Sequence, residues 1–234
     1  MGFPQITVIL PQFNHRAYLY EAVQGIISQT YPHWKILIMN DEPGLELDWY
    51  ELLDERIQVY QDGKRKGQAV RLNEGIALAD SDFIAIHDCD DVSIPQRFEL
   101  SVKYIQGYDA LYGDGIMLLK DGTQKYMSSN TPSLEILKTD SFGCFGSTFI
   151  RTDLAKRTPF RPVKYGNDWV WWIRIMKQNP MVVRLPLPLY FIRYYTSNYR
   201  VNPTNKFQAI KARIHKKIRL IELKKIINVE FECL

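Results

Sequence analysis

The sequence predicts an α/β protein with a mainly parallel sheet and helices on both of its faces. Over the first hundred residues, short apolar runs typical of buried strands alternate with segments of helical periodicity. Such alternation forms βαβ units, whose strands are parallel and whose crossover helices cover the sheet. A GxGxxG run does not follow the first strand, which argues against NAD chemistry.

The first βαβ unit is predicted over residues 6–39. Residues 6–10 are β-branched and apolar, as in a buried strand, and residues 35–39 repeat this character. Between them, the apolar residues of 17–29 follow helical spacing. This helix ends before Pro32, because the residue that precedes a proline avoids the helical conformation.

The alternation continues to a fourth strand. Residues 57–60 form a third, short strand, and a basic loop with two glycines follows over 62–67. Helical spacing returns over 68–79, and the apolar run 83–86 is the fourth buried strand. A further helix is predicted to open at Pro95, since proline suits the first turn of a helix.

The second half of the chain alternates less regularly. The Asp-Gly pair at 121–122 predicts a hairpin, since this pair suits a tight turn. We predict a strand end over 109–114, a strand over 146–150, a helix over 168–176, and two short strands over 181–184 and 189–192.

Residues 201–234 predict a basic amphipathic helix, in which isoleucines repeat at helical spacing among lysines and arginines. Two alternatives stay open for it: contact with an anionic membrane surface, or docking onto the domain by the isoleucine face. Much of the mild net charge of +4 lies here, and we expect no nucleic-acid partner. Three scattered cysteines, no signal peptide and no apolar run of the ~18–20 residues that a membrane span needs predict a cytoplasmic protein, with peripheral contact at the inner face of the membrane left open.

Three carboxylates follow the fourth strand directly: Asp88, Asp90 and Asp91. Three carboxylates within four residues repel one another unless a positive charge offsets them. Mn²⁺ or Mg²⁺ would do so, because hard divalent cations prefer oxygen ligands and share their shell with substrate phosphates. This predicts a metal–diphosphate site. The alternative is a solvated turn in which Asp91 or Ser93 caps the next helix.

Polar residues also follow the first and second strands, over 11–14 and at Asn40 and Asp41. The carboxyl ends of parallel strands meet at one edge of a sheet, where nucleotides bind in folds of this class. We therefore expect these residues to lie beside the aspartate cluster.

Four segments in this order resemble the family 2 glycosyltransferases, which have a GT-A fold with a Rossmann-like sheet. They cover nearly the whole N-terminal half: 8–14 with Tyr18-Leu19 and 28–32; 38–41; Gly67 with Arg71, Asn73, Gly75-Ile76 and Ala79; and 88–91 with Pro95 and Arg97. The resemblance implies one GT-A domain over 1–200, in which 1–100 binds the nucleotide sugar and 101–200 the acceptor.

The resemblance also implies roles for single residues. Asp41 would hydrogen-bond the nucleobase of a nucleotide-sugar donor, most often a UDP-sugar, and Asp168 would be the general base. The implied donor-binding residues are Pro11, Phe13, Asn14, Asp41, Gly67, Arg71 and Asp90; the implied metal ligands are Asp88, Asp90 and Asp91. Lys64, Arg65 and Lys66 are further candidates for diphosphate or base contacts, with an exposed basic loop as the alternative.

Three residues depart from the family pattern. Asn40 replaces a usual aspartate, which puts the base pocket in doubt, and Asn167 replaces a usual glutamate ahead of Asp168. Tyr195 replaces a common histidine two residues after Arg193. Trp169 and Trp172 are candidates for stacking on an acceptor sugar, with a place in the core as the alternative.

The function that this pattern implies is inverting transfer of a sugar to an acceptor hydroxyl in polysaccharide or glycolipid synthesis. A metal would stabilise the departing diphosphate, and a carboxylate would take the acceptor proton. Two alternatives stay open. One is a non-catalytic module that binds nucleotide sugars, and the other is a sugar nucleotidyltransferase, although the expected basic, glycine-rich loop does not follow the first strand.

Overall fold

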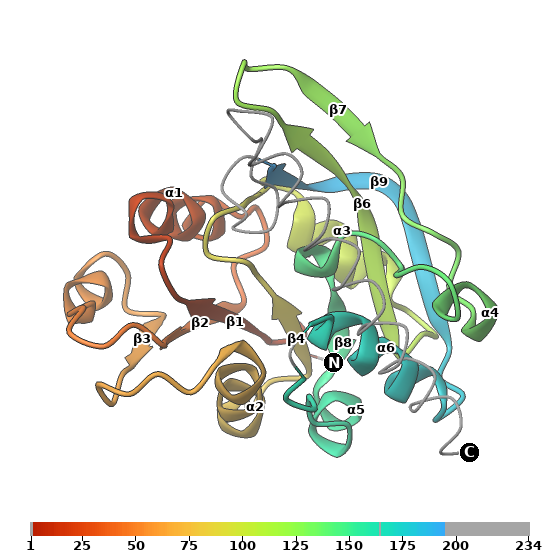
Figure 1. The fold of residues 1–234 in the computed structure, drawn as a ribbon, viewed down its shortest axis with the longest axis horizontal. Coiled ribbons are helices and arrows are strands. Elements are labelled where there is room, and N and C mark those ends of the chain that lie inside the picture. The colour runs from red at the N-terminus through yellow and green to blue at the C-terminus, as the bar shows by residue number, and fades with distance from the viewer. Residues whose placement is uncertain (1, 164, 195–234) are drawn as a thin grey trace, which may run out of the picture.

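The structure, a computed structural model, describes residues 2–163 and 165–194. One twisted sheet of nine strands runs through this part of the chain, in the order β3-β2-β1-β4-β8-β6-β9-β5, and β7 pairs with β6 beside that path (Figure 1). This mixed α/β arrangement confirms the predicted fold class. The helix predicted over 201–234 lies outside the described residues.

The elements of the first half alternate as predicted. They are β1 (Ile6–Gln12), α1 (Arg16–Ile27), β2 (Trp34–Asn40), the 3₁₀ helix η1 (Asp48–Leu52), β3 (Ile57–Tyr60), α2 (Gln68–Leu78), β4 (Phe83–Ile86), β5 (Val92–Ser93) and α3 (Arg97–Tyr104).

The elements of the second half are shorter and more varied. They are β6 (Ala110–Leu118), β7 (Gln124–Met127), α4 (Leu134–Leu137), the 3₁₀ helix η2 (Phe145–Ser147), β8 (Phe149–Arg151), α5 (Thr152–Arg157), α6 (Asn167–Met176) and β9 (Val182–Arg193).

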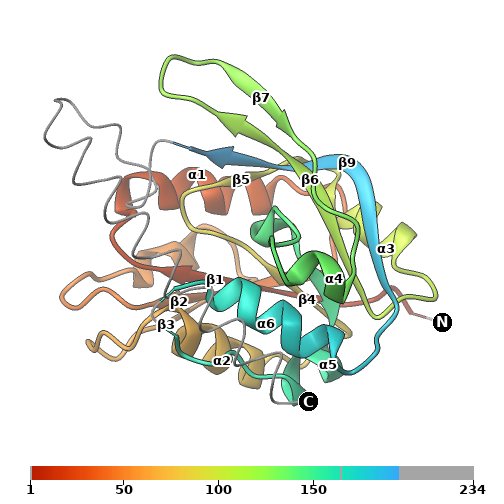
Figure 2. The same ribbon diagram turned by 45° about the vertical axis from the view of Figure 1, so that its right-hand side comes forward.

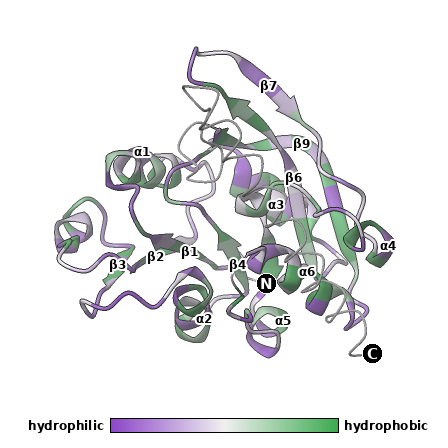
Figure 3. Cartoon of the chain, viewed as in Figure 1, coloured by the Kyte–Doolittle hydropathy of each residue, from purple (hydrophilic) through white to green (hydrophobic). Residues whose placement is uncertain are grey.

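Helices cover both faces of the parallel part of the sheet, with α1 on one face and α2 on the other (Figure 2). Alternate side chains of a strand point to opposite faces, so Val8 packs on the α1 side and Ile9 on the α2 side. The central strands β1, β2 and β4 are mostly apolar because both of their faces are covered, and the loop that leads from β3 into α2 is hydrophilic (Figure 3).

The first four strands are parallel, which brings their carboxyl ends to one edge. Ile6 pairs with Trp34 and Gln12 with Asn40 along the full length of β1 and β2. On its other side β1 pairs with β4, and β2 pairs with β3. The loops that follow β1, β2 and β4 therefore lie next to one another, as the sequence predicts.

The second half adds mostly antiparallel pairs. β8 pairs antiparallel with both β4 and β6, and the β6–β7 hairpin turns at Gly122, whose φ of 84° confirms the Asp-Gly turn. The prediction of two strands around Pro186 and Pro188 was wrong, because β9 is continuous from Val182 to Arg193. It passes the prolines through a shift of register against β6, where no ladder N–H is needed.

Two other boundaries differ from the prediction. The strand expected over 146–150 begins only at Phe149, because Phe145–Ser147 forms a 3₁₀ turn. The strand expected to end near Asp114 continues to Leu118. Both differences follow from pairing with distant strands, which local composition does not encode.

The alternative in which Asp91 or Ser93 caps the helix after the aspartate cluster was also wrong. Val92–Ser93 pairs with β9 as a strand, and the helix starts at Arg97 after Gln96, two residues later than Pro95. Residues 88–91 thus lie between two strands of one sheet. Among the described residues, no helix is long and apolar enough to cross a membrane.

Gly75 allows α2 to approach the sheet closely. A Cβ at this position would lie 2.6 Å from Cγ2 of Ile9. Gly75→Val should therefore lower the free energy of unfolding by about 2 kcal/mol through overpacking, as measured by urea denaturation. Ala77→Val, on the exposed side of the same helix, is the control and should change it by less than about 0.5 kcal/mol. Equal effects of both changes would contradict this account of the contact.

Candidate functional site

The loops after β1, β2 and β4 are joined by hydrogen bonds at the carboxyl edge of the sheet. The backbone N–H of Asp41 donates to Gln12 O (2.8 Å), and that of His87 donates to Ile9 O (3.0 Å). Oε2 of Glu42 accepts from the backbone N of Asn14 (2.8 Å) and from Nε2 of Gln12 (3.2 Å). These bonds confirm that the predicted strand-end residues lie together.

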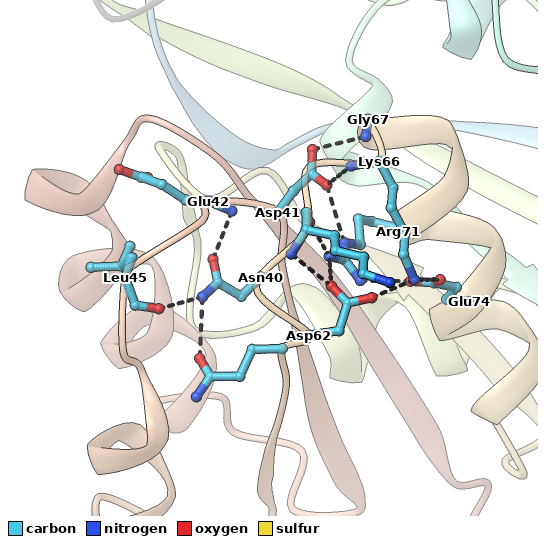
Figure 4. Close-up of polar contacts among 11 residues, drawn as sticks. Asn40, Asp41, Glu42, Leu45, Asp62, Lys66, Gly67, Arg71 and Glu74 are labelled. Carbon is cyan, nitrogen blue, oxygen red and sulfur yellow. Dashed lines mark hydrogen bonds and ion pairs between the residues drawn. The ribbon is translucent and has the colours of Figure 1, made fainter.

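Asp41 is buried at this edge and is held by the loop that enters α2 (Figure 4). Its carboxylate accepts from the backbone N–H groups of Lys66 (2.6 Å) and Gly67 (2.9 Å), and from Nε of Arg71 (3.2 Å). Gly67 has φ of 92°, a conformation that glycine adopts without strain. The loop is thereby fixed over Asp41.

Arg71 is buried at the centre of a network of acids (Figure 4). Its Nη1 donates to Glu74 (2.9 Å), and its Nη2 donates to Asp62 (2.6 Å) and to Lys64 O (2.6 Å). Arg71 and Lys66 both lower the pKa of Asp62 below its usual range. In this structure Arg71 therefore organises the loop.

Phe13 and Arg65 form a second link between the loops. The guanidinium carbon of Arg65 lies 4.0 Å from the centroid of the Phe13 ring, a cation–π contact. Pro11 is buried at the end of β1, whereas Asn14 is exposed with φ of 59°. The predicted donor-binding residues thus surround one part of the sheet edge.

Asn40 fixes the turn after β2. Its Nδ2 donates to Leu45 O (2.7 Å) and to Oε1 of Gln61 (3.2 Å), and its Oδ1 accepts from the backbone N of Glu42 (3.0 Å). A polar cavity of about 270 Å³ lies beside this turn. Asn40 therefore supports the loop that carries Glu42 and borders the cavity.

The aspartate cluster joins the two halves of the sheet. Asp91 is buried and accepts from the backbone N of Arg193 at the end of β9 (2.7 Å). Nη1 of Arg193 donates to Asp90 O (2.7 Å), and its Nη2 bonds to Glu21 of α1. The end of β9 therefore contacts both the aspartate cluster and α1.

Burial, followed by the neighbouring negative charges, raises the pKa values of two carboxyl groups in the cluster. Burial, then Asp90 and Asp168, raise the pKa of Asp88 to about 7. Burial, then Asp88 and Asp90, raise the pKa of Asp91 well above its usual range. Excess negative charge built from oxygen donors suits a hard divalent cation that takes its remaining ligands from phosphate and water. In the part of the chain that is described, no group of three or more His, Cys, Asp or Glu side chains is arranged to hold a metal ion by itself.

Asp168 faces this cluster from the second half of the chain. It is the second residue of α6, and its charge raises the pKa of Asp88 from across the site. Gly166 holds the N-cap position of α6, so Asp168 lies in the first turn of the helix. Oδ1 of Asn167 accepts from the backbone N of Val163 (3.0 Å) and so orders the segment before the helix.

The tryptophans of α6 separate into two environments. Trp172 is 3% exposed and packs against Tyr112 and Phe142 in the core. Trp169 is partly exposed, and its Nε1 donates to Leu137 O (2.8 Å). The structure thus places Trp169 at the boundary of the second half and Trp172 inside it.

Sequence analysis did not identify Glu21 or Tyr190 as parts of this site, and it did not predict the contact of Glu42. Each acts through a partner distant in the chain: Glu42 through Asn14, Glu21 through Arg193, and Tyr190 through Asp88. His87, which follows β4 directly, is fully buried. Tyr195 lies outside the described residues.

Comparison with known proteins assigns the family. The model of "Glycosyl transferase family 2" matches residues 7–166, more than half of the sequence. This chain therefore belongs to glycosyl transferase family 2.

Two relatives are similar over most of their length. TuaG of Bacillus subtilis, whose name assigns it to teichuronic acid biosynthesis, is 25% identical over 186 residues, which cover 75% of this chain and 73% of TuaG. WfgD of Escherichia coli is 24% identical over 217 residues, 88% of this chain and 82% of WfgD. Its name is UDP-Glc:alpha-D-GlcNAc-diphosphoundecaprenol beta-1,3-glucosyltransferase.

A solved structure shares the fold. A fragment of Staphylococcus aureus TarS in complex with UDP-GlcNAc superposes with a TM-score of 0.64 at 19% identity. The match covers 81% of this chain and 58% of the TarS chain. The chain thus spans less than two thirds of that protein, and the likeness concerns the fold.

The network around Arg71 should be more sensitive than a surface ion pair. Arg71→Lys removes the planar fork that joins Asp41, Asp62 and Glu74, and should lower the free energy of unfolding by about 2–3 kcal/mol in urea denaturation. Arg157→Lys alters a pair with Asp153 whose arginine is 52% exposed, and should change it by less than about 0.5 kcal/mol. A small effect at Arg71 would show that lysine can replace the fork.

Proposed function

We propose that this protein is a metal-dependent, inverting glycosyltransferase that transfers a sugar from a nucleotide-sugar donor, a UDP-sugar, to a hydroxyl of a glycan or glycolipid acceptor. The observation that carries the proposal is the aspartate cluster at the sheet edge with Asp168 opposite it. The relatives support the substrate class, since the name of TuaG refers to teichuronic acid biosynthesis and that of WfgD to UDP-Glc and a GlcNAc-diphosphoundecaprenol acceptor.

The first half of the chain would bind the donor nucleotide. Phe13 offers an aromatic face at the edge, and Asp41 offers a carboxylate fixed by three N–H donors. Pro11, Asn14, Gly67 and Arg71 hold the surrounding loops, and Asp90 follows β4 where the ribose would lie. A pocket assembled before the ligand arrives loses less entropy on binding.

Asp88, Asp90 and Asp91 would hold Mn²⁺ or Mg²⁺ together with the diphosphate. When bound, the metal supplies positive charge that stabilises the negative charge on the departing diphosphate. The backbone N–H of Arg193 fixes Asp91, and Arg193 fixes the carbonyl of Asp90, so this loop keeps its shape. The oxygen donors of these residues support the proposal of a metal site shared with the diphosphate.

Asp168 would act as the general base. A carboxylate within hydrogen-bond reach of the acceptor hydroxyl takes its proton as the oxygen attacks the anomeric carbon. The N-terminal end of α6 stabilises negative charge at this position. Attack on the face opposite the diphosphate inverts the anomeric centre.

Acceptor contacts are assigned to the second half. Trp169 is partly exposed next to Asp168 and could stack on a sugar, whereas the burial of Trp172 suits a role in the core. The division of one domain into 1–100 for the donor and 101–200 for the acceptor stays part of this proposal. So does a cytoplasmic place of action, with membrane contact through 201–234.

The donor site is tested by calorimetric titration of UDP with and without Mn²⁺. Wild-type protein should bind UDP more tightly with Mn²⁺, and Asp90→Asn should lose most of this gain because it removes one ligand charge. Asp121→Asn, in the distant β6–β7 turn, is the control and should bind as wild type does. Binding of GDP in place of UDP would assign a different donor nucleotide to the same site. No nucleotide binding at all would contradict the proposal.

The base is tested by kinetics. Asp168→Asn should lower kcat for transfer about 10²–10⁴-fold and leave the affinity for UDP nearly unchanged, because only the proton acceptor is lost. Measurement of UDP release with a panel of UDP-sugars and lipid-linked acceptors would show this. Unchanged turnover in Asp168→Asn would remove this residue from the mechanism. Metal-dependent UDP release by the wild type would exclude a module that only binds nucleotide sugars.

A further inference from the structure

The hydroxyl of Tyr190 lies directly behind the aspartate cluster. Tyr190 belongs to β9 in the second half of the chain and is fully buried. Its Oη accepts a hydrogen bond from the backbone N of Asp88 (2.7 Å), and lies 3.4 Å from Asp88 O and 3.2 Å from Nδ1 of His87. Nδ1 of His87 is in turn 2.8 Å from Asp88 O. Both polar groups of the Asp88 main chain are therefore held by these two buried rings.

The two rings pack against each other beside the Asp88 main chain, with centroids 5.0 Å apart and an interplanar angle of 67°. The tautomer of His87 that donates from Nδ1 satisfies the short contact with Asp88 O. The hydroxyl oxygen of Tyr190 accepts from the backbone N–H of Asp88, and its own proton points to Asp88 O.

The Tyr190 ring has no freedom to move away. A Cβ on Gly146 would lie 2.5 Å from Cε1 and 2.7 Å from Oη of Tyr190, so only glycine leaves room for the ring. The guanidinium carbon of Arg97 lies 5.2 Å from the ring centroid. The backbone of Tyr190 pairs with Ser93 of β5. The ring is therefore fixed by neighbours on several sides.

We infer that Tyr190 is a positioning residue that sets the orientation of Asp88 toward the donor diphosphate and its metal. Among the described residues, the hydrogen bonds given for Asp88 involve its main chain, and that main chain sets the direction of the Cα–Cβ bond that carries the carboxylate. Loss of the hydroxyl would leave a buried backbone N–H without its acceptor and free the peptide to rotate. This inference rests on the proposed function, because it assigns a role to Asp88 at that site.

Tyr190→Phe tests the inference by removing only the hydroxyl. Tyr112→Phe is the matched control, because Tyr112 is an equally buried tyrosine whose hydroxyl donates to Asn130 O (2.5 Å), outside the aspartate cluster. Calorimetric titration of UDP with and without Mn²⁺, melting temperature and hydrogen exchange at the Asp88 amide are measured for both variants and the wild type.

Tyr190→Phe should weaken UDP binding about three- to tenfold in the presence of Mn²⁺, the range that one hydrogen bond accounts for, and leave the metal-free affinity unchanged. The Asp88 amide should exchange faster. Tyr112→Phe should lower the melting temperature to a similar extent, and should keep wild-type Mn²⁺-dependent binding and wild-type exchange at Asp88.

Wild-type Mn²⁺-dependent affinity in Tyr190→Phe, together with a fall in melting temperature like that of Tyr112→Phe, would overturn the inference. If Tyr190→Phe does not fold, Gly146→Ala keeps the hydroxyl and displaces the ring; it should weaken binding equally, and wild-type affinity would overturn the inference.

If the wild type binds no nucleotide, the proposed function fails. Hydrogen exchange at the Asp88 amide is then the remaining test of the positioning role. An exchange rate in Tyr190→Phe equal to that of the wild type would overturn that role.

Discussion

Mutual repulsion among Asp88, Asp90 and Asp91 is the constraint around which this fold is arranged. These carboxyl groups lie where β4 ends, and burial raises the pKa of two of them. The second half of the chain holds them in place, since Arg193 of β9 fixes Asp91 and the carbonyl of Asp90. Without such support the segment that carries these carboxyl groups would lose two of its fixed points.

Asp41 and Asp88, both at the carboxyl edge of the sheet, are held by different kinds of groups. Around Asp41, charge is balanced inside the protein, because Arg71 and backbone N–H groups surround the carboxylate. Around Asp88, neutral groups hold the main chain and the negative charge is left for a ligand to balance. The proposed function would use both carboxylates, Asp41 toward the nucleobase and Asp88 toward the diphosphate and its metal.

The sequence was sufficient for the parallel half of the fold and for the edge where the site lies. Strands with two covered faces are continuously apolar, so β1–β4 were visible in composition, as were the acids that follow them. The antiparallel half was less visible. β9 continues through Pro186 and Pro188 only because β6 accepts a shifted register, which is a property of the pair. Contacts such as Glu42 with Asn14 and Tyr190 with Asp88 depend on side-chain directions that only the assembled sheet defines.

Arg193 is the last residue of β9, and its backbone N–H fixes Asp91. Its guanidinium also holds the carbonyl of Asp90 and bonds to Glu21 of α1. A displacement of this strand end would therefore move Asp90 and Asp91 together and change their position relative to α1.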